Sequence, residues 1–325
     1  MTSVYISSDS RGVWFGIADG AVYRGECHGG FEPKIVARLD CTLLSMIEAP
    51  HGGGALIGGD DGCVYRIGAD GTSSVLAHHP GRWVENLVAH AEVGIIGFSA
   101  GKSVHVLSTQ GGHEAICLEH SNSVSGIAIN PPGKRLAASH YDGVSLWWLG
   151  ARERTPKKLN WRGSHIAVSW SPDGRFLVTA TQENELHGWR LADGMDMAMS
   201  GYAAKPRSMS WTRTGRYLVT SGAPTLTCWN CAGAGPMGSK PIELGEPTAA
   251  MATVVACHPR KTVVAAGFDH GQIAVADIEL GLWASAMTSA GDRVTAIAWA
   301  PVGDALAFGT ESGLIGLLAV NTKAA

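Results

Sequence analysis

The residues best placed to do chemistry are acidic side chains that recur at one position of a repeated pattern. They follow short apolar segments and are Asp19, Asp61, Asp142, Glu183, Asp269 and Glu311. Carboxylates gathered from several segments would suit Ca²⁺ or another hard cation. Asp is also a natural residue of tight turns, and a position that recurs along the whole chain is typical of turn chemistry. We therefore expect these residues to form turns, and we expect no metal and no cofactor.

Cysteine and histidine are the other candidate ligands. Cys228 and Cys231 form a lone C-x-x-C at the end of a predicted strand, and Cys257 and His258 follow in the next repeat. Structural zinc needs four ligands, and a redox pair favours the start of a helix. Seven scattered cysteines, an odd number, are typical of a reducing compartment. We expect mostly buried free thiols, with the 13 histidines at turns and strand ends.

Other classes of site are not indicated. The chain has no G-x-S-x-G elbow and no G-x-G-x-x-G loop between a strand and a helix. Its formal net charge is −3 and its basic residues are scattered, so nucleic acid is not an expected partner. No segment approaches the roughly 18 apolar residues of a membrane span, and the N-terminus lacks a secretory pattern. We expect a cytoplasmic protein with no membrane partner.

A repeated turn organises the chain. An aromatic or branched residue is followed by a turn, a glycine four residues on and then a leucine, as in INPPGKRL (129–136), WSPDGRFL (170–177), WTRTGRYL (211–218) and WAPVGDAL (299–306). A strand-like alternation precedes each turn, and two further strands with a more polar fourth follow. Four antiparallel strands per repeat are what one blade of a β-propeller requires.

The period fixes the number of repeats. Inner strands are predicted to begin near residues 3, 44, 86, 124, 166, 207, 252 and 294, close to the period of about 40 to 45 residues of propeller repeats. One all-β domain over residues 1–325 follows, with eight four-stranded antiparallel blades. A seven-bladed ring with an irregular N-terminal hairpin is the alternative. Only five residues follow Val320, so the last blade is expected to have three strands unless the N-terminus supplies a fourth.

These repeats resemble the Trp-Asp (WD) repeat family, in divergent form, over nearly the whole chain. The Trp position is filled by Trp189, by Trp229 and by Trp147 or its neighbour Trp148, although Arg190 and Asn230 replace the Asp that should follow. The resemblance implies a structural network in each blade. In the best-matching blade its members would be His120, Ser139, Asp142 and Trp147.

The resemblance also implies a function. Members of this family are non-catalytic platforms that bind other proteins through loops on the propeller faces, and we expect a monomeric scaffold or adaptor. Aromatic residues with polar tips are common interface anchors. The candidates on the face of the acidic turns are Trp161, His165, His140, Tyr141, Tyr202, Phe268 and His270. A metal-dependent hydrolase or lyase that uses the central channel is the alternative, and a metal-handling accessory protein is a weaker one.

Overall fold

The fold was obtained as a computed structural model, which describes residues 3–109, 115–247, 249–288 and 291–320. All regular elements of these residues are β-strands, and none is a helix. The first half contains β1 (Ser3–Ile6), β2 (Gly12–Gly16), β3 (Ala21–Glu26), β4 (Lys34–Arg38), β5 (Leu43–Glu48), β6 (Gly54–Gly59), β7 (Cys63–Gly68), β8 (Ser73–His78), β9 (Leu87–His90), β10 (Ile95–Ala100), β11 (Ser103–Ser108), β12 (Ile116–Glu119), β13 (Gly126–Ile129) and β14 (Arg135–Trp148). The second half contains β15 (Lys157–Trp170), β16 (Phe176–Thr181), β17 (Leu186–Arg190), β18 (Asp196–Met199), β19 (Met209–Trp211), β20 (Tyr217–Thr220), β21 (Leu226–Asn230), β22 (Ile242–Leu244), β23 (Ala252–Cys257), β24 (Val263–Phe268), β25 (Gln272–Asp277), β26 (Leu282–Thr288), β27 (Val294–Trp299), β28 (Ala305–Thr310) and β29 (Ile315–Ala319).

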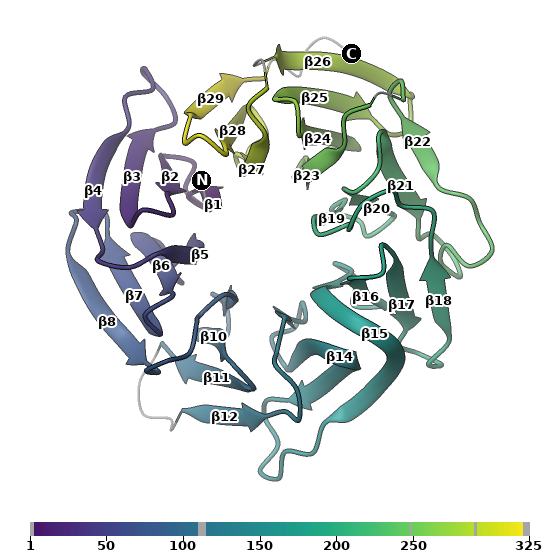
Figure 1. The fold of residues 1–325 in the computed structure, drawn as a ribbon, viewed down its shortest axis with the longest axis horizontal. Coiled ribbons are helices and arrows are strands. Elements are labelled where there is room, and N and C mark those ends of the chain that lie inside the picture. The colour runs from purple at the N-terminus through teal and green to yellow at the C-terminus, as the bar shows by residue number, and fades with distance from the viewer. Residues whose placement is uncertain (1–2, 110–114, 248, 289–290, 321–325) are drawn as a thin grey trace.

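The strands form a ring of antiparallel sheets around a central channel, so the predicted β-propeller is confirmed (Figure 1). Within a sheet the strands follow chain order, for example β1-β2-β3-β4 and β23-β24-β25-β26. The first strand of each sheet lies nearest the channel and the last lies at the rim. No helix in the described part of the chain is long and apolar enough to span a membrane.

One of the seven hydrogen-bonded sheets has six strands and contains two consecutive repeats. Strand β14 turns back on itself at Asp142 and Gly143, both at positive φ, and the amide of Leu149 donates to the carbonyl of Lys134. Strand β15 pairs with β14 through its first half and with β16 through its second half. The counts of seven and eight blades therefore differ by whether this sheet is taken as one blade or two.

The two ends of the ring can be compared with the predictions. The N-terminal segment forms a regular four-stranded sheet, β1 to β4, and not an irregular hairpin. The last sheet has three strands in the described residues, β27 to β29, as expected. The tail 321–325, on which that expectation partly rested, lies outside the described residues.

The repeated glycine is explained by the turn between the first and second strands. Gly133, Gly174, Gly215 and Gly303 have φ between 70° and 84°, a region that residues with a Cβ rarely adopt. Each donates its amide to a carbonyl three residues earlier at 2.8 Å. The turn-Gly-Leu pattern is thus a requirement of backbone geometry.

The tryptophan that opens the repeated turn links neighbouring repeats around the channel. The indole Nε1 of Trp170 donates to the carbonyl of Ala128 at 3.2 Å, and that of Trp299 donates to the carbonyl of Ala256 at 2.9 Å. The partners are 42 and 43 residues apart, which is one period of the repeat. These bonds tie first strands together, while apolar clusters between adjacent sheets supply the core.

The ring closes by packing between its first and last sheets. Val13 and Phe15 of β2 share an apolar cluster with Ala305 and Ala307 of β28, and all four side chains are almost completely buried. The first and last sheets are therefore held together by an apolar interface of the same kind as the others. This interface lies beside β29.

Candidate functional site

The two faces of the ring are built from different connections. We call turn face the side formed by the turns between second and third strands together with the segments that lead from one sheet to the first strand of the next. The opposite face carries the turns between first and second strands and between third and fourth strands. All seven predicted binding residues belong to the turn face, but the structure separates them by burial.

Four of the seven predicted anchors are buried, so the prediction that they are interface residues is wrong. Each is at most 8% exposed, and they are His140, His165, Tyr202 and Phe268. Their polar tips are already used inside the protein, or, for Phe268, the ring packs against Trp283 with centroids 5.9 Å apart. Aromatic rings with polar tips are as useful inside a sheet as at an interface, and the sequence pattern did not distinguish the two.

Tyr202 is part of a buried network. Its hydroxyl accepts a hydrogen bond from Nε1 of Trp229 at 2.7 Å and is bonded to Oγ1 of Thr220 at 2.7 Å. The Tyr202 and Trp229 positions are 27 residues apart, as are His120 and Trp147, whose side chains make the corresponding bond. This shared spacing is the signal that identifies Tyr202 as a structural substitute for the histidine of the repeat.

The predicted network around His120 is formed in part. Trp147 donates from Nε1 to Nε2 of His120 at 2.9 Å, so Nδ1 of His120 donates to the carbonyl of Lys102. Burial lowers the pKa of His120 to about 4, which keeps the ring neutral. Ser139 is buried and donates to the carbonyl of Gly126, whereas Asp142 is exposed at a positive-φ turn. Asp142 thus serves the hairpin itself.

His165 and His140 hold the neighbouring turn in place. Nε2 of His165 donates to the carbonyl of Trp161 at 3.0 Å, and Nδ1 accepts from Oγ1 of Thr179. Nδ1 of His140 donates to the carbonyl of Tyr141 at 2.8 Å, which fixes the backbone at an exposed aromatic residue. These histidines therefore support the surface from below.

The remaining predicted anchors reach solvent to different extents. Tyr141 is 54% exposed and His270 is exposed beside Asp269. Trp161 is half-buried because its ring stacks on His187 with centroids 3.8 Å apart. Tyr141 is thus an aromatic side chain that is both exposed and held by a hydrogen-bonded backbone.

Sequence reasoning missed Trp83, which is 60% exposed on the turn face and is the most exposed aromatic side chain among the described residues. The amide of Arg82 donates to the carbonyl of His79, and the amide of Val84 donates to that of Gly59. Val84 is fully buried, so the exposed indole stands on a fixed turn. Position between β8 and β9, on a connection between two sheets, was the available signal.

Trp83 and Tyr141 belong to neighbouring sheets and are linked through the structure between them. The side chain of Arg82 lies against Gly101, in the turn after β10. The next residue, Lys102, accepts hydrogen bonds from the backbone and ring of His120 through its carbonyl. The exposed basic residues Arg82 and Lys102 thus lie on the part of the turn face between the segments that carry Trp83 and Tyr141.

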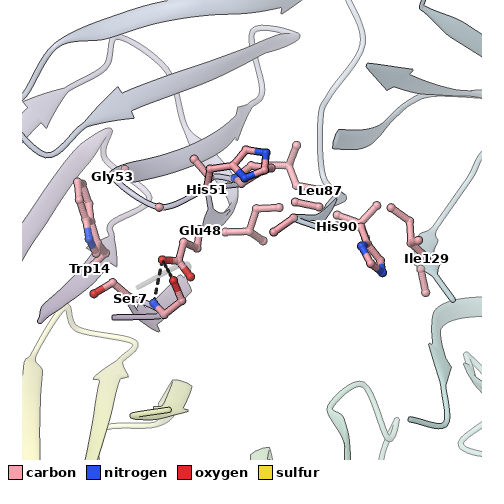
Figure 2. A pocket seen from close by; sticks show the side chains of 18 of the residues that line it. Ser7, Trp14, Glu48, His51, Gly53, Leu87, His90 and Ile129 are labelled. Carbon is pink, nitrogen blue, oxygen red and sulfur yellow. Dashed lines mark hydrogen bonds between the residues drawn. The ribbon is translucent and has the colours of Figure 1, made fainter. Parts of the chain in front are cut away.

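The opposite face contains the mouth of the channel, with a cavity of about 960 Å³. Figure 2 shows Glu48, His51 and His90 along its wall. Glu48 accepts hydrogen bonds from the amide and hydroxyl of Ser8 at 2.8 and 3.0 Å, while Nε2 of His90 donates to the carbonyl of Pro131. These polar groups bind the turns of adjacent sheets to one another.

The acidic turn residues lie on the other face from this cavity, and Asp19 and Asp61 have local partners. Asp19 accepts from the amide of Ala21, and Asp61 accepts from the amide of Cys63 and the hydroxyl of Tyr65. In the described part of the chain, no three residues of the types His, Cys, Asp and Glu are grouped so that they could hold a metal ion. The turn interpretation of these carboxylates agrees with this placement.

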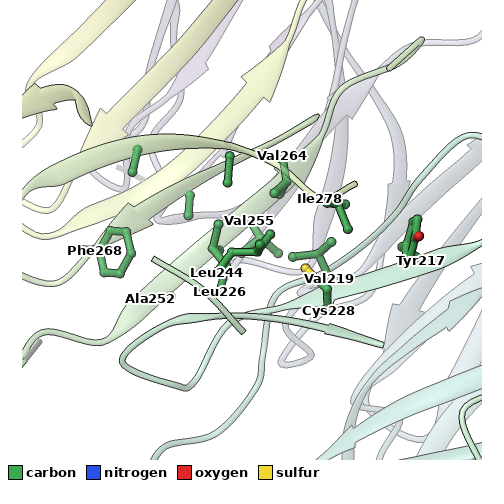
Figure 3. Packing of buried hydrophobic residues seen from close by; sticks show 13 residues of the cluster. Tyr217, Val219, Leu226, Cys228, Leu244, Ala252, Val255, Val264, Phe268 and Ile278 are labelled. Atoms are coloured by element: carbon green, nitrogen blue, oxygen red, sulfur yellow. The ribbon is translucent and has the colours of Figure 1, made fainter. Parts of the chain in front are cut away.

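The C-x-x-C cysteines lie inside the protein. Cys228 is fully buried in an apolar cluster with Val219 and Leu226, and burial raises its pKa (Figure 3). Cys231 is 1% exposed, with its pKa raised to about 12 by burial. All seven cysteines are free, and four are buried. Thiols of this kind are protonated and unreactive at neutral pH.

His258, the other residue considered beside the C-x-x-C, has a structural place. Its Nε2 donates to the carbonyl of Gly303 at 3.1 Å, and its Nδ1 accepts from the amides of Arg260 and Lys261. Both ring nitrogens are therefore occupied by protein partners.

Comparisons with known proteins agree with the geometry. The family model described as "WD domain, G-beta repeat" matches residues 102–148 and 158–190. WD repeat-containing protein slp1 of Schizosaccharomyces pombe is 26% identical over 226 residues, which are 66% of this chain and 46% of that protein. The chromatin assembly factor 1 subunit FAS2 homolog of Oryza sativa subsp. japonica is 26% identical over 109 residues, 31% of this chain and 22% of that protein. The chain spans less than half the length of these curated relatives.

Solved structures show the same fold over nearly the whole chain. The C-terminal WD40 domain of Sif2 superposes with a TM-score of 0.80 at 13% identity, covering 99% of this chain and 96% of that one. The computationally designed Ika8 protein superposes with a TM-score of 0.77 at 18% identity, covering 98% of this chain and 96% of that one. The solved structures thus show the β-propeller fold, and the matched segments 102–148 and 158–190 are similar to WD repeats.

Proposed function

We propose that this protein is a non-catalytic scaffold that binds another protein through its turn face, with Trp83 and Tyr141 as the main anchors. The observation that carries the proposal is the 60% exposure of Trp83 on a turn whose flanking backbone is fixed by hydrogen bonds. A large ring that is already ordered loses little conformational freedom on binding. Trp, Tyr and Arg are also the residue types that contribute most at protein interfaces.

The surroundings of the two anchors support the same function. Tyr141 is held by the bond from His140 to its carbonyl, and Arg82 flanks Trp83. Buried histidines beneath the surface, among them His120, make hydrogen bonds that stabilise the turns. The exposed rings of Trp83 and Tyr141 are then free to contact a partner. The comparisons support a protein-interaction scaffold, since one relative is named as a WD repeat-containing protein and the other as a homolog of a chromatin assembly factor 1 subunit.

The proposal is tested by quantitative affinity capture with matched tryptophan variants. Trp83→Ala removes the anchor on the turn face, whereas Trp148→Ala removes an indole that is 46% exposed at the far end of β14, toward the opposite face. Proteins captured from native lysate are identified by mass spectrometry, and the principal partner is then titrated by calorimetry. We expect Trp83→Ala and Tyr141→Ala each to weaken binding at least tenfold, as hot spots do.

Trp148→Ala should keep the affinity of the unmodified protein. The outcome that contradicts the proposal is the reverse, in which Trp148→Ala loses the partner while Trp83→Ala retains it. Loss of affinity in all three variants together with altered circular dichroism would point to misfolding, and the fold of each variant is therefore checked first.

A further inference from the structure

The last sheet has an open edge. In the described part of the chain, every other third strand of a repeat pairs with a fourth, but β29 pairs only with β28. Main-chain N–H and C=O groups on such an edge are a template for another strand. The place of the missing strand lies at the rim, between β26 and β4 (Figure 1).

The backbone of β29 shows which groups are available. The amide of Val320 donates to the carbonyl of Asp304, toward β28. Since hydrogen-bonding groups alternate in direction along an antiparallel strand, every second residue directs its N–H and C=O to the open side. These residues are Ile315, Leu317 and Ala319.

The side chains of β29 are only partly covered. None of its five residues is buried, whereas every third strand that pairs with a fourth has at least two buried residues, such as those of β11. In a complete blade the outer strand supplies an apolar side chain to the core, as Leu244 of β22 does beside Leu226 (Figure 3). At β29 the corresponding apolar surface is formed by Ile315 and Leu317 with residues of the first sheet, including Phe31.

The shape of the slot selects a single strand as its occupant. β29 occupies the place that β3 and β25 have in their sheets, so the neighbouring outer strands β4 and β26 extend beyond it (Figure 1). A second copy of this protein would present the same recessed edge behind its own β4 and β26. Two such edges cannot meet without a clash between the flanking outer strands, whereas one extended peptide can enter.

Charge gives the occupant a direction. Asp304 lies at the C-terminal end of β29, and Glu26 ends β3 in the adjoining sheet. Burial raises the pKa of Cys27 to about 11, with Glu26, Asp304 and Asp9 adding to the effect and Arg24 opposing it. Arg24 is itself paired with Glu26 at 2.9 Å. The acidic groups thus gather at the end of the slot where an antiparallel strand would begin.

We propose that β29 binds an extended segment of another protein as the fourth strand of the last blade, a segment with a basic residue at its N-terminal end followed by alternating apolar residues. The basic residue meets Asp304 and Glu26, and the apolar side chains cover Ile315 and Leu317. The rim site uses different residues from the turn face.

The probe is a fluorescent peptide of sequence KTLTVT, with two controls. The peptide KTLTPT has a proline in place of the valine, which removes an N–H directed at β29, and ETLTVT reverses the charge of the first residue. Binding is measured by fluorescence anisotropy, and hydrogen exchange follows the amides of residues 315–319. We expect KTLTVT to bind and to protect residues 315–319, KTLTPT to bind at least tenfold more weakly, and ETLTVT to be weakened by a similar factor.

Variants of the protein separate backbone pairing from packing. Leu317→Pro removes an N–H that points to the open side, and proline is tolerated on edge strands in that orientation. Leu317→Ala, the matched control, removes the same side chain but keeps the N–H. We expect Leu317→Pro to bind at least tenfold more weakly than Leu317→Ala. If Leu317→Pro does not fold, Asp304→Lys still tests the proposal. This variant should reverse the charge preference, so that ETLTVT binds better than KTLTVT.

Several outcomes would overturn the proposal. No binding of KTLTVT at millimolar concentration would do so, as would binding that leaves residues 315–319 unprotected. Protection of these amides in the free protein would show that the slot is already filled, by a segment of the same chain if it is independent of concentration or by a second copy if it is not. Trp83→Ala should leave the affinity for KTLTVT unchanged, which distinguishes failure here from failure of the turn-face proposal.

Discussion

Replacement of Tyr202 by phenylalanine tests whether the buried network beside β19 stabilises the fold. The substitution removes one hydroxyl group and keeps the ring, which is 8% exposed. That hydroxyl accepts a 2.7 Å hydrogen bond from Nε1 of Trp229 and is bonded to Thr220 at 2.7 Å. Without it, the indole N–H is left buried with no acceptor.

The expected loss follows from the cost of an unsatisfied buried donor, about 1 to 3 kcal/mol. Oγ1 of Thr220 can still donate to the carbonyl of Thr227, at 3.4 Å, so its loss is smaller. We therefore expect Tyr202→Phe to lower the free energy of unfolding by about 2 kcal/mol. A loss of that size shifts the equilibrium toward the unfolded state by roughly 30-fold.

The measurement is urea denaturation followed by circular dichroism, with Tyr217→Phe as the matched control. Tyr217 is 4% exposed, but its hydroxyl makes none of the hydrogen bonds found among the described residues, so its replacement should cost less than about 0.5 kcal/mol. In a Trp229→Phe background, which lacks the indole N–H, Tyr202→Phe should cost markedly less than in the unmodified protein. Equal losses for Tyr202→Phe and Tyr217→Phe would refute the reasoning.

Two further predictions concern buried groups. Burial lowers the pKa of His187 to about 4. The contribution of this residue to the free energy of unfolding is therefore fully present above pH 6.5, and it falls between pH 6.5 and 4 by at most roughly 3 kcal/mol. Denaturation of His187→Phe should show a smaller loss of stability over that range, and an equal loss would contradict the role given to His187. Gly303→Ala should lower the melting temperature far more than Gly313→Ala, because a Cβ at Gly303 would overlap the ring of His258 whereas none of the described atoms lies near a Cβ at Gly313. Both glycines have positive φ, so comparable losses would mean that backbone strain alone is responsible.

The sequence was sufficient for the architecture because the repeat is a local requirement repeated many times. A glycine such as Gly174 is needed at the first turn of a repeat because that turn has positive φ. A tryptophan such as Trp170 places an indole that donates to the preceding repeat. Each of these residues depends on contacts within one period or with the adjacent period. Periodicity alone therefore predicts the strands, the turns and the ring.

The role of the residue at the Asp position of the repeat, which follows Ala276 in one blade and Trp229 in another, emerged only from the structure. Asp277 accepts the amide of Glu279, and Asn230 accepts that of Ala232, so both close the turn that follows the third strand. Arg190 cannot accept a hydrogen bond, and it instead binds Asp193 further along that turn. Replacement of the Asp of the repeat thus changes the local partner and leaves the turn intact.

Which aromatic residues reach solvent was decided by tertiary structure. Tyr202 and Tyr141 look alike in sequence, yet one hydroxyl is enclosed by the next repeat and the other ring projects from a two-residue hairpin turn. The sequence places Trp83 on a connection between two sheets but does not show that its ring is exposed, because that exposure depends on Val84 being drawn into the core beside it.

The sequence by itself determined a ring of four-stranded repeats, free cysteines and acidic residues at turns, since these depend on spacing and on residue type. The sequence also predicted a last blade of three strands, which agrees with β27 to β29 in the described residues. Tertiary structure decided which side chains remain exposed. Exposure is a property of how adjacent sheets meet, and it follows from contacts between residues far apart in the chain, which the period does not encode.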